Sequence, residues 1–115
     1  MFNPQQWPPE LDALIAAPQN HTLLFENESV RVLDTLVRSG QTVPLHTHRW
    51  PGALYLVSWS DFIRRDTTGS VLLDSRTITR PSEGTAFWSA PLLPHTLENI
   101  GASTLRIISV ELKSQ

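Results

Sequence analysis

The sequence contains no cysteine, which excludes disulfide bonds, thiolate metal ligands and cysteine nucleophiles. It contains no apolar run near the roughly 18 residues that a membrane-spanning helix requires. Residues 1–10 lack a basic region followed by an apolar one, so we expect no signal peptide and assign the cytoplasm by default. Five glycines against nine prolines indicate defined turns rather than flexible linkers.

An excess of charge of one sign is also absent. Nine basic and 11 acidic residues give a net charge of −2, so the sequence offers no electrostatic basis for binding nucleic acid. The single basic doublet, Arg64-Arg65, is flanked by Asp61 and Asp66. We interpret this doublet as a solvated surface pair, because short charge motifs usually are.

The composition that remains is typical of one folded domain: 115 residues, 40% hydrophobic and 17% charged. Pro8-Pro9-Glu10 predicts the start of a short helix, because proline at the first helical position loses no needed donor. Apolar residues then follow at helical spacing: Leu11, Leu14 and Ile15. Pro18 ends this run, so we assign residues 1–21 to an N-terminal helical extension and residues 22–115 to the main domain.

From about residue 22 the chain consists of short segments typical of β-strands, separated by turn residues. The expected strands are residues 22–25, 30–38, 43–48, 53–62, 71–74, 76–79, 85–88, 95–99 and 104–112. Many short strands without a second helix predict an all-β fold, a sandwich or a barrel.

Two of the four histidines form the segment His46-Thr47-His48. In a strand both imidazoles lie on one face, about 6–7 Å apart at the backbone, so the two rings can converge on one ion. Imidazole is the commonest neutral ligand of first-row transition metals. For this pair alone, two exposed or core-packed histidines would be the plainer interpretation, because short motifs often match by chance.

The pair does not occur alone. The segment Gly40–His48 resembles the first half of the first cupin motif, Gly-x5-His-x-His. Gly84 and the segment His95–Asn99 resemble parts of the second motif, Gly-x5-Pro-x-Gly-x2-His-x3-Asn. The resemblance runs from about residue 22 to residue 112. It implies a cupin-type double-stranded β-helix, a jelly-roll barrel, preceded by the short N-terminal helix.

The resemblance also implies a metal site on His46, His48 and His95. The glutamate that normally completes the first motif is missing, because Gly52 or Ala53 stands at its position. Three neutral imidazoles leave a divalent ion its full charge and an open coordination position, which favour an anionic ligand and catalysis. We expect one divalent transition metal, with iron first for the chemistry and zinc, nickel, copper or manganese as alternatives.

Two functions follow from the resemblance. The first is a mononuclear metalloenzyme, similar to dioxygenases or isomerases, that acts on a small organic molecule; three-histidine cupins include dioxygenases of thiols and diketones. The alternative is a non-catalytic module that binds a small ligand, with or without metal. The sequence assigns no catalytic residue and leaves the question of an enzyme open. Because small cupins commonly pair, we expect a homodimer.

The expected pocket candidates are Trp50, Tyr55 and Trp88, although ordinary core packing is the plainer interpretation of each tryptophan. The facing of Tyr55 depends on strand register. Alignment of the missing glutamate at Gly52 turns the even-numbered residues of this strand inward, whereas alignment at Ala53 turns Tyr55 inward. His21 precedes the first expected strand and has no partner in the sequence, so we expect it at the surface.

Overall fold

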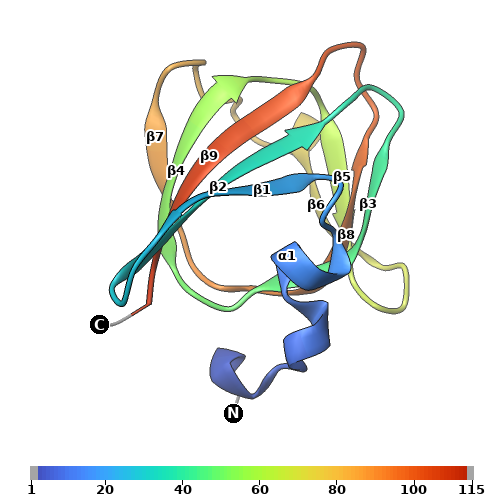
Figure 1. The fold of residues 1–115 in the computed structure, drawn as a ribbon. Helices are drawn as coiled ribbons and strands as arrows, with labels where there is room; N and C mark the ends of the chain where they lie inside the picture. The colour runs from blue at the N-terminus through green and yellow to red at the C-terminus, as the bar shows by residue number, and fades with distance from the viewer. Residues whose placement is uncertain (1–2, 114–115) are drawn as a thin grey trace.

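The computed structural model describes residues 3–113, and Figure 1 shows two antiparallel sheets that face each other around a shared interior. The strands are β1 (His21–Glu26), β2 (Val30–Val37), β3 (Thr42–His48), β4 (Gly52–Ser58), β5 (Phe62–Arg65), β6 (Val71–Asp74), β7 (Ala86–Ser89), β8 (Leu92–Asn99) and β9 (Leu105–Leu112). One sheet has the order β1-β2-β9-β4-β7 and the other the order β3-β8-β5-β6. The expected all-β fold is confirmed.

The N-terminal segment forms short helical pieces rather than one continuous helix: η1 (Pro4–Gln6), η2 (Pro9–Leu11) and α1 (Ala13–Ala16). Asp12 separates the last two, because its backbone is extended while its carboxylate caps α1 by accepting from the Leu14 N–H. Asp12 also forms an isolated β-bridge with Thr47, which places the segment against β3. Within residues 3–113, no helix has the length and apolar character needed to cross a membrane.

The structure differs from the expected strands in two places. The segment 53–62 is not one strand, since β4 ends at Ser58 and β5 begins at Phe62. The Trp59 N–H in this break donates to the Glu83 carboxylate instead of a neighbouring strand. The expected strand 76–79 does not form: Ser75–Thr77 make a 3-10 turn, and the Asp74 carboxylate accepts from the backbone and the guanidinium of Arg76.

The hydrophobic core fills one part of the barrel and adjoins a cavity, whose lining it shares at Val37 and Val43. Its buried members are Ala17, Val37, Val43, Leu56, Trp59, Phe62 and Leu105. Asn99, the last residue of the segment that resembles the second motif, is buried beside this core. Its amide donates to the carbonyl oxygens of Val37 and Ser103 and accepts from the Ser60 hydroxyl. These bonds tie β8 to β2 and to the loop before β9.

The register of β4 settles which of its residues face the interior. Leu56 is fully buried and Leu54 lines the cavity, whereas Tyr55 is 46% exposed on the outer face. This facing corresponds to the alignment of the missing glutamate at Gly52. A Cβ atom at Gly52 would overlap the carbonyl oxygen of Val110 on β9, so this backbone has no room for a side chain there.

Candidate metal centre

Three histidines from the two cupin-like motifs meet inside the barrel. His46 and His48 lie on one face of β3, as their spacing predicted, and His46 is directly paired with His95 of β8. The ring centroid of His46 lies 5.0 Å from that of His48 and 4.3 Å from that of His95. The rings of His48 and His95 are 6.1 Å apart. Directly paired residues of neighbouring strands face the same side of a sheet, which explains how residues 49 positions apart come together.

The expectation of a surface position for His21 is wrong. His21 is 3% exposed and begins β1, where it pairs with Thr35 of β2, a residue of the cavity wall. Its ring lies 4.9 Å from that of His46 and 5.2 Å from that of His48. The remaining residues of β1 are exposed, so no alternation of apolar and polar residues marked His21 as an inward position.

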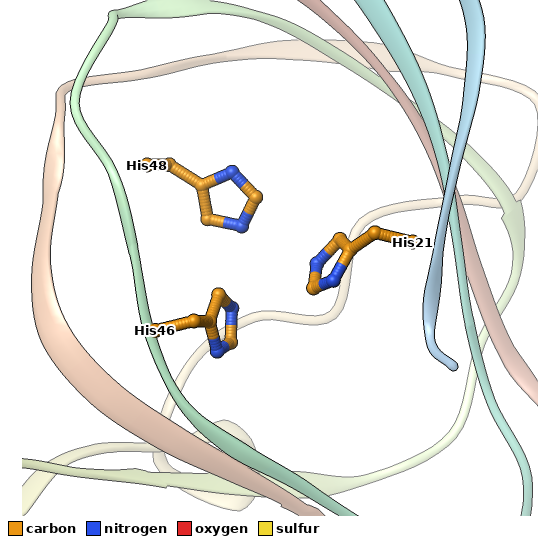
Figure 2. Close-up of side chains that lie close together, drawn as sticks. All are labelled: His21, His46 and His48. Atoms are coloured by element: carbon orange, nitrogen blue, oxygen red, sulfur yellow. The ribbon is translucent and has the colours of Figure 1, made fainter. Parts of the chain in front are cut away.

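Figure 2 shows the rings of His21, His46 and His48 pointing toward one another from β1 and β3. One ring nitrogen from each lies within 4.8 Å of the others, so these three form a group that can hold a metal ion. Bonds of about 2.0–2.1 Å allow two ligand nitrogens on one ion to lie up to roughly 4.2 Å apart. Only a small inward shift separates this group from metal-binding dimensions. His95 lies beside the group, and its part in the expected metal set stays a prediction.

Backbone carbonyl groups fix the orientation of three of the four rings. The Nδ1 atoms of His21, His46 and His95 lie 3.0, 2.7 and 2.6 Å from carbonyl oxygens of residues two to four positions earlier in the chain. A carbonyl oxygen can only accept, so each Nδ1 carries the proton and each Nε2 keeps its lone pair. The Nε2 of His21 is buried without a hydrogen-bond partner. This arrangement is what a metal-binding imidazole requires.

Burial keeps these rings neutral. It lowers the pKa of His21 to about 4 and that of His95 to about 3, and the neighbouring histidines add to the effect. Burial followed by the charges of the other three histidines lowers the pKa of His46 still further. Neutral imidazoles are metal ligands and protonated ones are not, so the three rings can bind an ion at neutral pH without losing a proton.

His48 is held by a carboxylate instead of a carbonyl. Its Nδ1 lies 2.7 Å from Glu111 Oε2, and Glu111 Oε1 accepts from the Nε of Arg31 at 2.7 Å. The other guanidinium nitrogens of Arg31 donate to both oxygens of Asp12, at 2.9 and 3.0 Å. We call this chain of contacts the Arg31 network: His48, Glu111, Arg31 and Asp12. It connects the histidine group to the N-terminal segment.

The two carboxylates of the Arg31 network are buried and ionised. Burial alone would raise the pKa of Glu111, but the hydrogen bonds and charges of His48 and Arg31 outweigh it and lower the pKa. The same balance, with Arg31 as the main partner, lowers the pKa of Asp12. Sequence reasoning did not single out Glu111. It lies opposite Gly52 in the pairing of β9 with β4, so a neighbouring strand supplies a carboxylate beside the position where the motif lacks one.

A cavity of about 70 Å³ lies against the histidines. Its lining includes all four imidazoles, Trp50, Glu111 and Arg64, with mostly apolar residues between them: Val37, Val43, Leu54, Leu92, Leu97 and Ile107. Of the three expected pocket residues, Trp50 lines this cavity. Tyr55 does not line it, and Trp88 is 60% exposed on the outer face of β7.

Arg64 was not expected at this cavity. The interpretation of Arg64-Arg65 as a solvated surface pair is wrong for Arg64, because it pairs with the inward-facing Leu97 of β8 and shares its face. Arg65 faces the other side, where its guanidinium forms an ion pair with Glu98 at 2.9 Å. Two adjacent strand residues always face opposite sides, so only one member of such a doublet can be a surface residue when the other side of the sheet is covered.

Solved structures with cupin folds resemble this arrangement of strands. A cupin domain from Bordetella pertussis aligns with a TM-score of 0.65 and 15% identity, over 82% of this chain and 92% of that one. An RmlC-like cupin from Methanocaldococcus jannaschii aligns with a TM-score of 0.56 and 14% identity, over 80% and 77%. The polyketide cyclase RemF from Streptomyces resistomycificus aligns with a TM-score of 0.52 and 16% identity, over 82% and 64%.

These similarities identify the fold. The chain has the double-stranded β-helix fold of the cupins, as the motif residues predicted. Inside this fold lies a buried group of three histidines, His21, His46 and His48, only two of which belong to the motifs. No family model and no curated protein matches the sequence.

Proposed function

We propose that the chain is a metal-binding cupin in which His46, His48 and His95 hold one divalent transition metal ion, with His21 as a fourth imidazole beside them. The proposal depends above all on one observation: every histidine Nδ1 is hydrogen-bonded to a carbonyl or carboxylate oxygen. Each Nε2 is therefore left as the metal-facing donor. Iron is the first choice for oxygen chemistry, and zinc, nickel, copper and manganese also accept imidazole.

Within this proposal, the chain acts as a mononuclear metalloenzyme, dioxygenase-like or isomerase-like, on a small organic molecule. A bound ion would supply Lewis acidity toward an oxygen atom of that molecule. Backbone carbonyls and Glu111 orient the four rings, and apolar side chains form most of the cavity wall. The cavity volume of about 70 Å³ suits a molecule of a few heavy atoms. The presence of a polyketide cyclase among proteins of this fold supports an enzymatic use of it.

Metal analysis of protein purified without a polyhistidine tag tests the proposal. After incubation with Fe²⁺, Zn²⁺, Ni²⁺, Cu²⁺ or Mn²⁺ and removal of the excess, we expect about one ion per chain for at least one of these metals. His46→Gln and His48→Gln should lose most of this metal with the circular dichroism spectrum retained. Comparison of His95→Gln with His21→Gln then separates the two possible sets of three ligands.

Trp88→Ser provides a matched control, because Trp88 lies exposed on the outer face of β7 and away from the cavity. This variant should keep the full metal content. If the wild-type protein retains none of the five metals, the metal proposal falls and a metal-free ligand-binding module takes its place. A homodimer stays a prediction for the assembly, and sedimentation of the same purified protein tests it.

A further inference from the structure

The cavity contains a positive charge that no residue of the described chain neutralises. Arg64 is partly buried, and its Nε is fully enclosed without a hydrogen-bond partner. Among residues 3–113 its guanidinium has no carboxylate partner, and its one recorded contact of this kind is the ring of Phe62 at 5.8 Å. A buried charge without a partner is destabilising, so such groups are rare unless something else pairs with them.

Every other arginine that faces a neighbouring strand in this barrel is paired. Arg31 contacts Asp12 and Glu111, Arg65 contacts Glu98, and Arg106 contacts Asp34. Each of these strand arginines therefore has a carboxylate partner, whereas Arg64 has none among the described residues. An arginine side chain stays protonated at neutral pH even where burial lowers its pKa, as it does here.

The position of Arg64 places this charge beside the histidines. It pairs with Leu97 of β8, and His95 lies two residues from Leu97 on the same face. The charge of Arg64 contributes to the lowered pKa of His95, after burial and the neighbouring His48. Arg64 also lines a second hollow, whose other walls are formed by Leu72, Pro91, Leu92, Leu93 and His95.

Neither hollow offers a free carboxylate to this guanidinium. The carboxylate of the main cavity belongs to Glu111, and both of its oxygens are already engaged by His48 and Arg31. The second hollow contains no carboxylate. A ligand is therefore the remaining source of a negative charge for this guanidinium.

We propose that the cavity binds a small organic carboxylate, whose carboxylate group pairs with Arg64 while its apolar body lies against Leu54, Leu92, Leu97 and Ile107. The planar fork of the guanidinium matches the two oxygens of a carboxylate. A phosphate group would need several further donors, whereas the remaining wall is mostly apolar. Any contact between this ligand and a metal ion depends on the proposed function above. The pairing of the ligand with Arg64 does not depend on it.

Calorimetric titration with matched pairs of probes tests this inference. The probes are butyrate against butyramide and benzoate against benzamide, with 2-oxobutyrate and inorganic phosphate titrated alongside. Each pair has nearly the same shape and differs in charge. We expect at least one carboxylate to bind the wild-type protein about tenfold to a hundredfold more tightly than its amide, the range of a charged hydrogen-bonded pair.

Two variants localise the effect. Arg64→Met keeps the length of the side chain without its charge and should abolish the preference for the carboxylate. Arg65→Met is the matched control, because Arg65 is the next residue but faces the outer side, and it should leave the preference unchanged. Equal binding of each carboxylate and its amide to the wild-type protein, or tighter binding of phosphate, would overturn the inference without reference to any variant. Persistence of the preference in Arg64→Met would overturn it too.

The metal content of every sample, measured in parallel, separates this inference from the proposed function. Bound metal without any carboxylate preference would remove the Arg64 site and leave the metal proposal standing. A carboxylate preference in protein that retains no metal would support the Arg64 site and remove the metal proposal. Repetition with chelator-treated protein shows whether Arg64 acts without the ion, and the preference should then be reduced but still present.

Discussion

Two arginines face the same interior from opposite sheets, and they differ in their hydrogen-bond partners. Arg31 of β2 donates three side-chain hydrogen bonds to Asp12 and Glu111 and lies 4.8 Å from the ring of Trp50. Arg64 of β5 donates none to the described part of the chain. Both lie near histidines: Arg31 reaches His48 through Glu111, and Arg64 lies on the face that contains His95.

The comparison distinguishes a structural charge from one that is free to bind. The guanidinium of Arg31 donates its hydrogen bonds to residues of the protein itself. These bonds hold the N-terminal segment through Asp12 and the imidazole of His48 through Glu111. The guanidinium of Arg64 has no such partner in the described residues, and it lies where a ligand would contact both this charge and the histidines. Polar groups that a fold leaves unsatisfied in a cavity are the groups with which it recognises ligands.

The largest expected effect is loss of the paired arginine. Arg31→Met leaves Asp12 and Glu111 buried as unpaired negative charges, so we expect the free energy of unfolding to fall by about 3–5 kcal/mol. Urea denaturation at pH 7 measures this change. Arg106→Met is the control, because it breaks an exposed pair with Asp34 and should change stability little. A wild-type urea midpoint in Arg31→Met would contradict a structural role for the network.

The second effect distinguishes the carboxylates of Asp12 and Glu111 from the buried ring of His21 by their response to acid. In metal-free protein, His21 takes up a proton at about pH 4 when folded, against its ordinary value of 6.5 when unfolded. Between these pH values the unfolded state binds a proton that the folded state does not, so stability falls as the pH falls from about 6.5 toward 4. The pKa values of Asp12 and Glu111 are lowered, so their contribution is lost only at more acidic pH.

Urea midpoints of chelator-treated protein between pH 7.5 and 4.5 test this order. His21→Gln removes one titrating ring, and its midpoint should therefore fall less steeply than that of the wild type across this range. Bound metal should shift the loss of stability to lower pH, because the ion competes with protons for the same nitrogens. Identical slopes for the two proteins would show that His21 is not held neutral.

The part of this site that the sequence could predict is the part encoded by local spacing. His46 and His48 share a face because their separation is two residues in a strand, and the motif order brings His95 to the next strand. The sequence could not decide whether Leu54 or Tyr55 faces the interior, because a slip of one residue in strand register reverses the facing of both side chains. The structure decides this through the tight approach of Gly52 to β9.

The residues that sequence reasoning missed depend on long-range pairing. His21 and Glu111 reach the cavity because β1 pairs with β2 and β9 lies between β2 and β4, and neither pairing leaves a local signal. Arg64 was misjudged because its acidic neighbours in sequence suggested a surface. One of them, Asp61, accepts from the Ser75 hydroxyl, and the other, Asp66, caps the turn after β5.

The smallest expected effect concerns the stability of Arg64→Met, and its sign is the informative part. Removal of a buried charge that has no partner relieves a desolvation cost, so we expect the free energy of unfolding to stay unchanged or rise by about 1 kcal/mol. The pKa of His95 should rise as well, because one of the positive charges that lower it is gone. Urea denaturation measures the first change, and titration of the His95 ring by NMR measures the second.

A rise in stability together with loss of carboxylate binding would mean that Arg64 costs the fold something and is useful only to a ligand, the trade-off typical of binding residues. A fall in stability close to that of Arg31→Met would mean the opposite: Arg64 would then have a partner inside the protein and would not be available to a ligand. The sign of this one small change therefore decides whether the two arginines differ in function or only in the identity of their contacts.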